Sequence, residues 1–344
     1  MNRTAITHEL KLLAQAQGFR AAGVAPAMTP TGVHRFYDWL AAGYAGEMSY
    51  LVDRADAYRH PDQVMPGARS LLMMALDYRT RAPQPSRPGQ GRVSCYAWGS
   101  QDYHDLVHAK LKRLRKEVER LIPGVRVRGV IDTAPLLERE FAQLAGLGWQ
   151  GKNTMLICPT AGSYFFLAAL LLDVELTYDA PFPTDHCGAC TACLDACPTG
   201  AFPEPYVLDA TRCISYLTIE LKSMVPLAQR SQLGDWLLGC DICQEVCPWN
   251  RFAPQSLEPA LQPREDLDGV QLSKLFYLDD DVFRATFRRT PLWRPKRRGI
   301  LRNAALILAG HPDSDSAQAL EHGTRDPDPL VRDASQWALD QLNS

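Results

Sequence analysis

The sequence predicts a protein of mixed α/β or α+β class, built in three parts. In residues 1–180, strand-like and helix-like hydrophobic patterns alternate, which predicts an α/β domain. Residues 181–255 are rich in cysteine, and eight of the ten cysteines lie between Cys187 and Cys247. Residues 256–344 have a helical pattern with two segments that resemble a HEAT-type repeat. Two such helices are too few for a free-standing solenoid, so we expect them to pack against the rest of the chain.

The elements of the first part follow from hydrophobic periodicity. Residues 1–60 have a helical pattern. Helices and strands are then expected in turn: a strand over Ser70–Leu76, a helix over Tyr103–Leu121, a strand in 125–132, a helix over 134–148, and strands in 153–157 and 164–176. Pro135 fits the first turn of its helix, where its missing N–H is not needed. In the third part, helices are expected at 297–310 and 326–342.

Composition and charge limit the class of protein. With 46% hydrophobic and 22% charged residues the composition is that of an ordinary globular chain, and the net charge of −2 excludes a protein that is basic throughout. The longest apolar run, Phe165–Leu172, is far shorter than the ~20 residues that span a bilayer. The N-terminus reads as an amphipathic helix and not as a signal peptide. We therefore expect a cytoplasmic protein that does not enter a membrane.

The cysteine module has the spacing of a protein with two [4Fe–4S] clusters. Its first half follows the bacterial ferredoxin pattern C-x2-C-x2-C-x3-C-P, in Cys187, Cys190, Cys193 and Cys197. Its second half supplies Cys240, Cys243 and Cys247, but Leu237 occupies the first position of the pattern, and Cys213 is the only nearby thiol to replace the missing ligand. The inferred ligand sets are Cys187, Cys190, Cys193 and Cys247 for one cluster, and Cys197, Cys213, Cys240 and Cys243 for the other. Zinc, which also uses C-x2-C pairs, is the alternative, but it explains two interlocked runs poorly.

The two cysteines outside the module have simpler interpretations. Cys158 follows a predicted buried strand, where a free cysteine acts as a small hydrophobe. Cys95 lies among polar and aromatic residues after a loop rich in Pro and Gly. Cys95 could belong to an active site, although these residues alone favour a structural role.

A glycine-rich stretch at 146–152 matches two nucleotide-binding patterns by its letters. Gly146, Gly148 and Gly151 spell G-x-G-x-x-G, and Gly146, Gly151 and Lys152 spell G-x-x-x-x-G-K. Both patterns require a strand before the glycines and a helix after them, whereas here the helix comes first. The sequence thus predicts a helix C-cap and a turn at the first two glycines. Lys152 and Asn153 remain suited to a ligand with phosphate or amide groups.

A basic segment lies between Arg284 and Arg302. It contains eight cations and no acid, and Phe287 and Trp293 are interleaved with them. On a chain of net charge −2 this segregation is typical of a surface that binds nucleic acid. The alternative is a solvated charged helix, although helix faces usually mix both signs.

Several segments together resemble the epoxyqueuosine reductase family. These are "VIDTAPLLER", "GWQGKNTMLI", "CISYLTIE" with the displaced Cys213, "CDICQEVCPWN" and "KRRGILRNAALILAG", which cover most of the chain in order. The resemblance implies a reductase that removes the epoxide oxygen of epoxyqueuosine at the wobble position of tRNA. It implies two [4Fe–4S] clusters that pass electrons to a cobalamin in the α/β domain. It also implies a fold similar to that of reductive dehalogenases, with a helical-repeat region added at the C-terminus.

The resemblance also assigns residues. Asp132 lies where the family has its general acid, and a desolvated carboxyl with a raised pKa could protonate the departing oxygen. The alternative is that Asp132 is the N-cap of the helix that follows. Residues implied to contact the cobalamin are Arg54, Cys95, Asp102, Asp132, Lys152, Asn153, Thr154, Ser215, Tyr216 and Asp241. Residues expected to contact tRNA are Lys222, Arg294, Lys296, Arg297, Arg298 and Arg302.

The sequence also leads to expectations about partners and leaves two alternative functions open. We expect a monomer that receives electrons from an external low-potential donor. One alternative is a cobalamin reductase of a small molecule, like a reductive dehalogenase, which would have no need of the basic C-terminal segment. Another is a two-cluster electron-transfer protein that uses its N-terminal half for docking and does not need Asp132.

Overall fold

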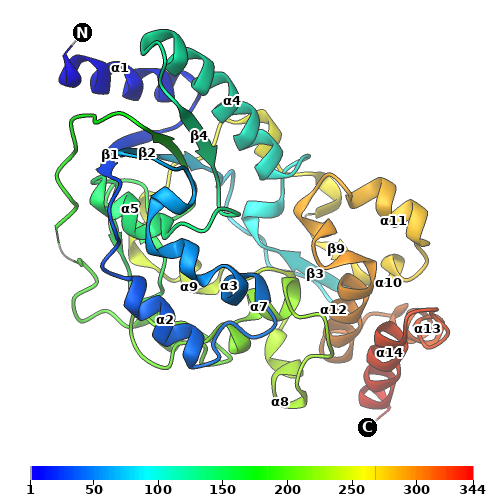
Figure 1. Cartoon of the computed structure of the whole chain (residues 1–344). Coiled ribbons are helices and arrows are strands. Elements are labelled where there is room, and N and C mark those ends of the chain that lie inside the picture. Colours follow the sequence, from blue (N-terminus) through cyan, green and yellow to red (C-terminus); the bar gives the residue numbers. More distant parts are fainter. Residues whose placement is uncertain (1, 184, 268, 344) are drawn as a thin grey trace.

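A four-stranded sheet forms the centre of the first part of the chain (Figure 1). The structure is a computed structural model that describes residues 2–183, 185–267 and 269–343. The strand order is β1-β2-β7-β4, and each neighbouring pair is antiparallel. The strands are β1 (Ala21–Pro26), β2 (Ser70–Asp77), β4 (Val127–Val130) and β7 (Phe165–Leu172). The longest register runs from Ser70 opposite Leu172 to Asp77 opposite Phe165.

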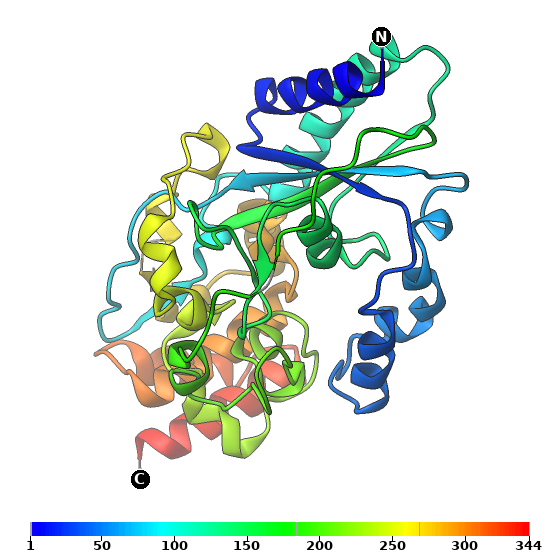
Figure 2. The same cartoon turned by 90° about the vertical axis from the view of Figure 1, so that its left-hand side faces the viewer.

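The two central strands carry apolar side chains on both faces, from Leu71 to Leu76 in β2 and throughout β7, because helices cover both faces of the sheet. Helices α1 (Arg3–Ala16) and α4 (Tyr103–Leu121) pack on one face, which buries Leu72 and Met74 of β2. Helix α5 (Glu138–Leu144) packs on the other face and buries Leu71 and Met73. Successive side chains of a strand point to opposite faces, so an all-apolar strand suits this layered position. Figure 2 shows α1 on one side of the sheet, with most of the molecule on the other.

A second sheet joins the three parts that the sequence predicts. Strand β3 (Gln90–Val93) pairs in parallel with β8 (Trp236–Leu238) and antiparallel with β9 (Val270–Gln271). The three strands come from the α/β part, the cysteine module and the C-terminal region, respectively. One apolar core also runs from Leu10 through Leu237 to Val331. The three parts that differ in sequence pattern therefore form one continuous structure.

The C-terminal helices pack against the rest of the chain, as predicted. Helix α12 (Lys296–Gly310) is buried from Gly299 to Leu308 and contacts β8 on one side and α14 on the other. Around it lie α10 (Leu272–Leu275), α11 (Asp280–Phe287), α13 (Ser316–Gly323) and α14 (Pro329–Leu342). No helix within the described ranges is long and apolar enough to cross a membrane.

Several expectations for local structure need correction. The first 60 residues include strand β1, which the helical pattern did not predict. Helix α5 begins at Glu138, after the expected start at residue 134, and the strand expected at 153–157 is reduced to β6 (Leu156–Ile157), paired with β5 (Trp149–Gln150). The remaining helices are α2 (Val33–Ala41), α3 (Ser49–Asp53), α6 (Ala192–Asp195), α7 (Ile214–Ile219), α8 (Leu227–Arg230) and α9 (Ile242–Glu245).

The glycine-rich stretch ends helix α5, as predicted. Gly146 has a φ of 78°, in the left-handed region that glycine adopts without strain. Its N–H donates to the carbonyl of Gln143, and the N–H of Leu147 donates to that of Ala142, which is the Schellman pattern. A Cβ on Gly148 would lie 2.1 Å from the carbonyl oxygen of Ile157. The glycines therefore end a helix and let two backbones approach closely.

Candidate functional site

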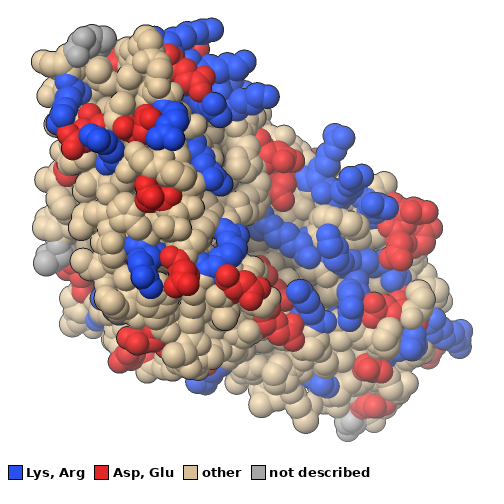
Figure 3. Space-filling model, in the orientation of Figure 1, with Lys and Arg blue, Asp and Glu red and all other residues tan. Residues whose placement is uncertain are grey.

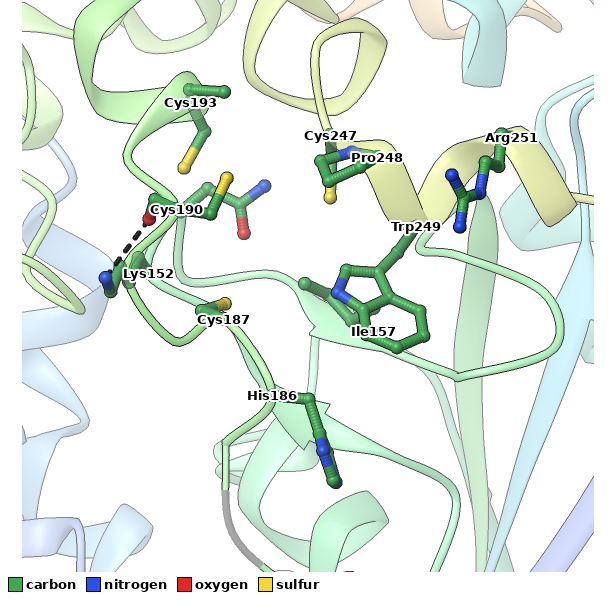
Figure 4. A pocket seen from close by; sticks show the side chains of 12 residues that line it. Lys152, Ile157, His186, Cys187, Cys190, Cys193, Cys247, Pro248, Trp249 and Arg251 are labelled. Atoms are coloured by element: carbon green, nitrogen blue, oxygen red, sulfur yellow. Dashed lines mark hydrogen bonds between the residues drawn. The ribbon is translucent and has the colours of Figure 1, made fainter.

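The first predicted cluster set surrounds a cavity. Cys187, Cys190, Cys193 and Cys247 line a space of about 230 Å³, together with Lys152 and Trp249. Figure 4 shows the sulfur atoms of the four cysteines directed toward this common space. The cavity has room for an inorganic group among the thiols, and the second half of the module supplies one of the four.

The cysteines predicted to bind the second cluster lie close together in a more deeply buried part of the molecule. Burial raises the pKa of the Cys243 thiol, and the charges of Cys213 and Cys197 act in the same direction, so these sulfurs are neighbours. Cys240 has Cys213 and Cys243 as close neighbours in the same way. The N–H of Ala201 donates to the Cys197 sulfur at 3.3 Å. The displaced Cys213 therefore lies beside the three cysteines with which the spacing grouped it.

The arrangement of the thiols suits cubic clusters. Among the described residues, no three His, Cys, Asp or Glu side chains converge on a single metal ion. In a [4Fe–4S] cube each iron binds its own cysteine, so the four ligands surround the cube and do not meet at one point. The four cysteines around the cavity therefore fit the group that their spacing predicts, because they surround a common space (Figure 4).

The loop at Lys152 holds the cysteine module in place. Lys152 Nζ donates to the carbonyls of Gly188 and Cys190 at 2.6 and 3.1 Å. Asn153 Nδ2 donates to the carbonyl of Cys243 at 3.2 Å, and its side chain is buried. Thr154 is buried with a φ of 63°, and its carbonyl accepts from Arg139 at 2.8 Å. All three residues thus have protein partners, in addition to the cofactor contact that the resemblance implies.

Asp132 follows β4 in a strained backbone conformation. Its φ is 27°, a value that non-glycine residues rarely adopt. Helix α5 begins six residues later, and its N-cap Leu137 makes no side-chain hydrogen bond. The alternative interpretation of Asp132 as a helix N-cap is therefore wrong.

Two neighbouring residues of α4 bind the Asp132 carboxylate. Tyr103 Oη donates to Oδ2 at 2.5 Å, and His104 Nε2 lies 2.5 Å from Oδ1. Burial alone would raise the pKa of Asp132, but the hydrogen bond and charge of His104 and the hydrogen bond from Tyr103 outweigh it and lower the pKa. The prediction of a raised Asp132 pKa is therefore wrong, because the carboxylate is not only desolvated but also held by two donors.

Asp102 and Arg294 extend this network. Asp102 caps α4 by accepting from the His104 N–H at 3.0 Å, and its Oδ1 lies 2.8 Å from His104 Nδ1. Arg294, just before α12, donates to Asp102 at 3.3 Å and stacks over the ring of Tyr103 at 4.8 Å. Arg54 Nη2 donates to the carbonyl of Thr133 at 2.8 Å, so it contacts the same loop as Asp132.

Cys95 and Asp241 lie where the second cysteine set meets the α/β part. Asp241 is buried, accepts from the Cys95 N–H at 2.7 Å, and also accepts from the hydroxyl of Ser94. Burial raises the pKa of the Cys95 thiol well above its usual value, and the charge of Asp241 adds to this. Cys95 therefore stays a neutral thiol. Of the other two predicted contacts, Tyr216 accepts from the N–H of Glu47 at 2.7 Å, and Ser215 precedes it at the start of α7.

Sequence reasoning missed three residues of this site. Tyr103 and His104 directly follow Asp102, but a Tyr-His pair at a helix start carries no signal of its own. The Oε1 atom of Glu138 is buried and has no hydrogen-bond partner among the described residues. Burial raises the pKa of Glu138 to about 8, and the nearby charge of Asp132 adds to this. A neutral carboxyl therefore lies beside the ionised Asp132.

The predicted tRNA contacts divide into buried and exposed residues. Arg302 is fully buried and donates to the carbonyls of Leu217, Leu221 and Ser223, so the prediction that it contacts tRNA is wrong. Arg297 pairs with the buried Asp326 at 2.7 Å and is largely enclosed. The exposed cations are Lys222, Arg284, Arg288, Arg289, Lys296 and Arg298. Figure 3 shows Lys and Arg side chains gathered over the region of α11 and α12.

Comparisons with known proteins agree with this site. Residues 186–250 match the family model of a 4Fe-4S double cluster binding domain. The fold and the two sets of cysteines thus define an iron–sulfur protein with two [4Fe–4S] clusters, and the zinc alternative is set aside. Residues 59–133 match the family model of epoxyqueuosine reductase QueG.

Full-length relatives then identify the family. The epoxyqueuosine reductase of Pseudomonas aeruginosa is 40% identical over 94% of this chain and 90% of its own. That of Xanthomonas campestris is 38% identical over 96% and 95%. A crystal structure of an epoxyqueuosine reductase with an epoxyqueuosine-modified tRNA-Tyr stem loop matches with a TM-score of 0.92 and 31% identity, over 100% of this chain and 92% of that one. The chain belongs to the epoxyqueuosine reductase family, so the predicted family and fold are confirmed.

Proposed function

We propose that this protein reduces epoxyqueuosine to queuosine in the anticodon loop of tRNA, with cobalamin as cofactor and electrons delivered through the two clusters. Its relatives carry the name of this activity at up to 40% identity over nearly the whole chain. This full-length match favours a tRNA substrate over a small-molecule substrate or a simple electron carrier.

The observation that carries the proposal is a continuous set of contacts from the second cysteine set to Asp132. Asp241, next to Cys240, binds the backbone of Cys95. The ring of Tyr96 packs edge-on against Tyr103 at 5.8 Å, and Tyr103 donates to Asp132. An electron source and a proton-handling carboxylate are thus neighbours, as a reductive removal of oxygen requires.

The residues around Asp132 fit a large cofactor rich in amides. Donors and acceptors come from several segments, and the buried Oε1 of Glu138 has no partner among the described residues. The side chains that would hold the cobalamin are Arg54, Cys95, Asp102, Lys152, Asn153, Thr154, Ser215, Tyr216 and Asp241. When bound, cobalamin supplies the reducing centre that acts on the epoxide. Asp132 then acts as the proton donor to the departing oxygen.

The protein surface supports docking of an RNA. The exposed cations near α11 and α12, with Lys222 near α7, support this proposal, because contacts from such cations to phosphates position an RNA without reading its bases. The wobble nucleotide leaves the anticodon stack to reach the site. The protein acts as a monomer in the cytoplasm, and an external low-potential electron donor reduces the clusters.

The test is conversion of an epoxyqueuosine-containing tRNA stem loop by the reconstituted enzyme. Wild-type protein with cobalamin and a chemical reductant is expected to form queuosine, measured by nucleoside mass spectrometry. Asp132→Asn keeps the size of the side chain but cannot deliver a proton, so we expect its rate to fall by about 10² to 10⁴-fold. No queuosine from wild-type protein contradicts the function, and full activity of Asp132→Asn contradicts the role of the acid.

A further inference from the structure

The imidazole of His104 lies between two carboxylates. Its Nε2 is 2.5 Å from Asp132 Oδ1, and its Nδ1 is 2.8 Å from Asp102 Oδ1. The ring stacks on Tyr103 with centroids 4.3 Å apart, which fixes its plane. A carboxylate at each ring nitrogen favours the doubly protonated imidazolium, because both N–H groups then donate to a negative charge.

The surrounding charges place the proton on His104 and not on Asp132. Burial lowers the pKa of His104, but the hydrogen bonds to Asp102 and Asp132 outweigh it and raise the pKa to about 9. The same contact lowers the pKa of Asp132. The other titratable groups that act on this pair are Tyr50, Tyr103, Glu138, Glu220 and Arg294. At neutral pH the pair is therefore an imidazolium beside a carboxylate.

The proposed reaction needs more protons than Asp132 can hold. Conversion of an epoxide to an alkene and water consumes two electrons and two protons. The clusters supply the electrons one at a time from the external donor. An ionised carboxylate has no proton to give, so another group must supply it.

On the basis of the proposed function, we propose that His104 is the positioning residue that stores the proton which Asp132 delivers. The Nε2 proton passes to Asp132 Oδ1, and Asp132 gives it to the epoxide oxygen as the C–O bond breaks with its electron pair moving to oxygen. The neutral imidazole takes a new proton from solvent, which it reaches because its side chain is 20% exposed. The second proton follows the same route, and the oxygen leaves as water.

Asp102 and Arg294 have opposite effects on protonation of the His104 ring. Asp102 accepts the Nδ1 proton and so stabilises the imidazolium. Arg294 Nη2 lies 2.7 Å from the same nitrogen, and a guanidinium can only donate, so its charge opposes protonation of the ring. The histidine thus responds to a cation that belongs to the C-terminal region.

The first measurement follows the histidine ring directly. Holoenzyme labelled in its histidine rings, with its clusters left oxidised, is titrated by NMR. We expect one ring signal with a pKa of about 9, lost in His104→Gln and kept in His108→Gln. His108 is an exposed residue one turn further along α4 and serves as the matched control. A His104 signal that titrates at the ordinary value of 6.5 overturns the proposal.

The second measurement is the pH dependence of stem-loop reduction. Wild-type activity is expected to fall as pH rises through about 9, where His104 loses its proton. Glutamine still donates to Asp132 but stores no proton, so His104→Gln should lower the rate at neutral pH by about 10²-fold and remove this alkaline limb. Asp102→Asn should move the limb to lower pH, and Arg294→Gln should move it to higher pH.

The outcomes separate this proposal from the function on which it rests. If wild-type protein forms no queuosine, the function fails, and the NMR titration alone decides whether His104 holds the proton. If queuosine forms and His104→Gln keeps the wild-type rate and pH profile, the proposal that His104 stores the proton is refuted. If His104→Gln folds poorly, the Asp102 and Arg294 variants decide whether His104 stores the proton. A merely structural role of His104 would leave the alkaline limb of the pH profile at the same pH in both variants.

Discussion

The role of Arg302 in the structure differs from the role that the sequence predicts. In the sequence it ends a basic run, but in the fold its guanidinium lies in the interior and donates to three backbone carbonyls. Burial lowers the pKa of Arg302 to about 10, so it remains charged at neutral pH. Its hydrogen bonds connect α12 with α7 and with the segment after α7, so its role is structural.

Replacement of Arg302 should therefore affect stability more than RNA binding. Arg302→Met keeps much of the volume but leaves the carbonyls of Leu217, Leu221 and Ser223 without a donor, at an expected cost of about 3 kcal/mol. Differential scanning calorimetry should show the apparent melting temperature lowered by about 4 °C, because 344 residues at about 2.1 cal/mol/K each give an unfolding entropy of about 0.7 kcal/mol/K. Arg298→Met, at an exposed position of the same helix, should change it little. Equal melting temperatures for the two variants would refute this role.

The site residues could be predicted only where spacing carries the chemistry. The eight cluster cysteines follow from the C-x2-C pattern, because the ligand geometry of a cluster fixes distances along the chain. The network of Asp132 joins residues of α4, the loop after β4 and the segment before α12. Their contacts arise from the tertiary fold, so no local pattern indicates His104 or Arg294.

At the scale of elements, hydrophobic pattern predicted long segments better than short ones. Helix α4 spans Tyr103–Leu121 as expected, because its apolar stripe extends over several turns. Strand β1 was missed, since the sequence AAGVAP contains small residues and a proline and has no alternation. Helix α5 begins late because the strained segment around Asp132 occupies the residues before it.

The C-cap of α5 gives a test at this scale. Gly146→Ala forces a side chain into the left-handed region and places its Cβ 2.9 Å from the carbonyl oxygen of Ala180, so we expect a loss of about 1–2 kcal/mol. Gly310→Ala is the matched control, because a Cβ there meets nothing within 4 Å and α12 is helical at this residue. Thermal denaturation should separate the two variants. A Gly146 variant as stable as the Gly310 variant would contradict the assigned cap.

At the scale of the whole molecule, the distribution of charge predicts how RNA binds. Arg288 and Arg289 are exposed directly after the last residue of α11. Reversal of both to Glu should weaken stem-loop binding and reduce the slope of log K against log salt by about 2, since each lost phosphate contact removes nearly one released counterion. Fluorescence anisotropy at several salt concentrations measures both quantities.

Reversal of Lys112 and Lys116 on α4 makes the same change in net charge at a different surface and is the control. An equal loss of binding for the two double variants would show that only net charge matters. Arg297 is unsuitable for such a reversal, because it pairs with the buried Asp326 and its loss would disturb the fold.

The sheet formed by β8, β3 and β9 has a consequence for how the protein is made. Strand β3 ends at Val93, but its partners begin only at Trp236 and Val270. At a synthesis rate of about 5–20 residues per second, both partner strands of β3 have been synthesised only on the order of ten seconds after β3 itself. All the cluster cysteines up to Cys247 emerge during that interval, before β9 can close the sheet. The nascent chain therefore passes through a period in which all eight cluster cysteines can receive iron and sulfide before β9 completes the sheet.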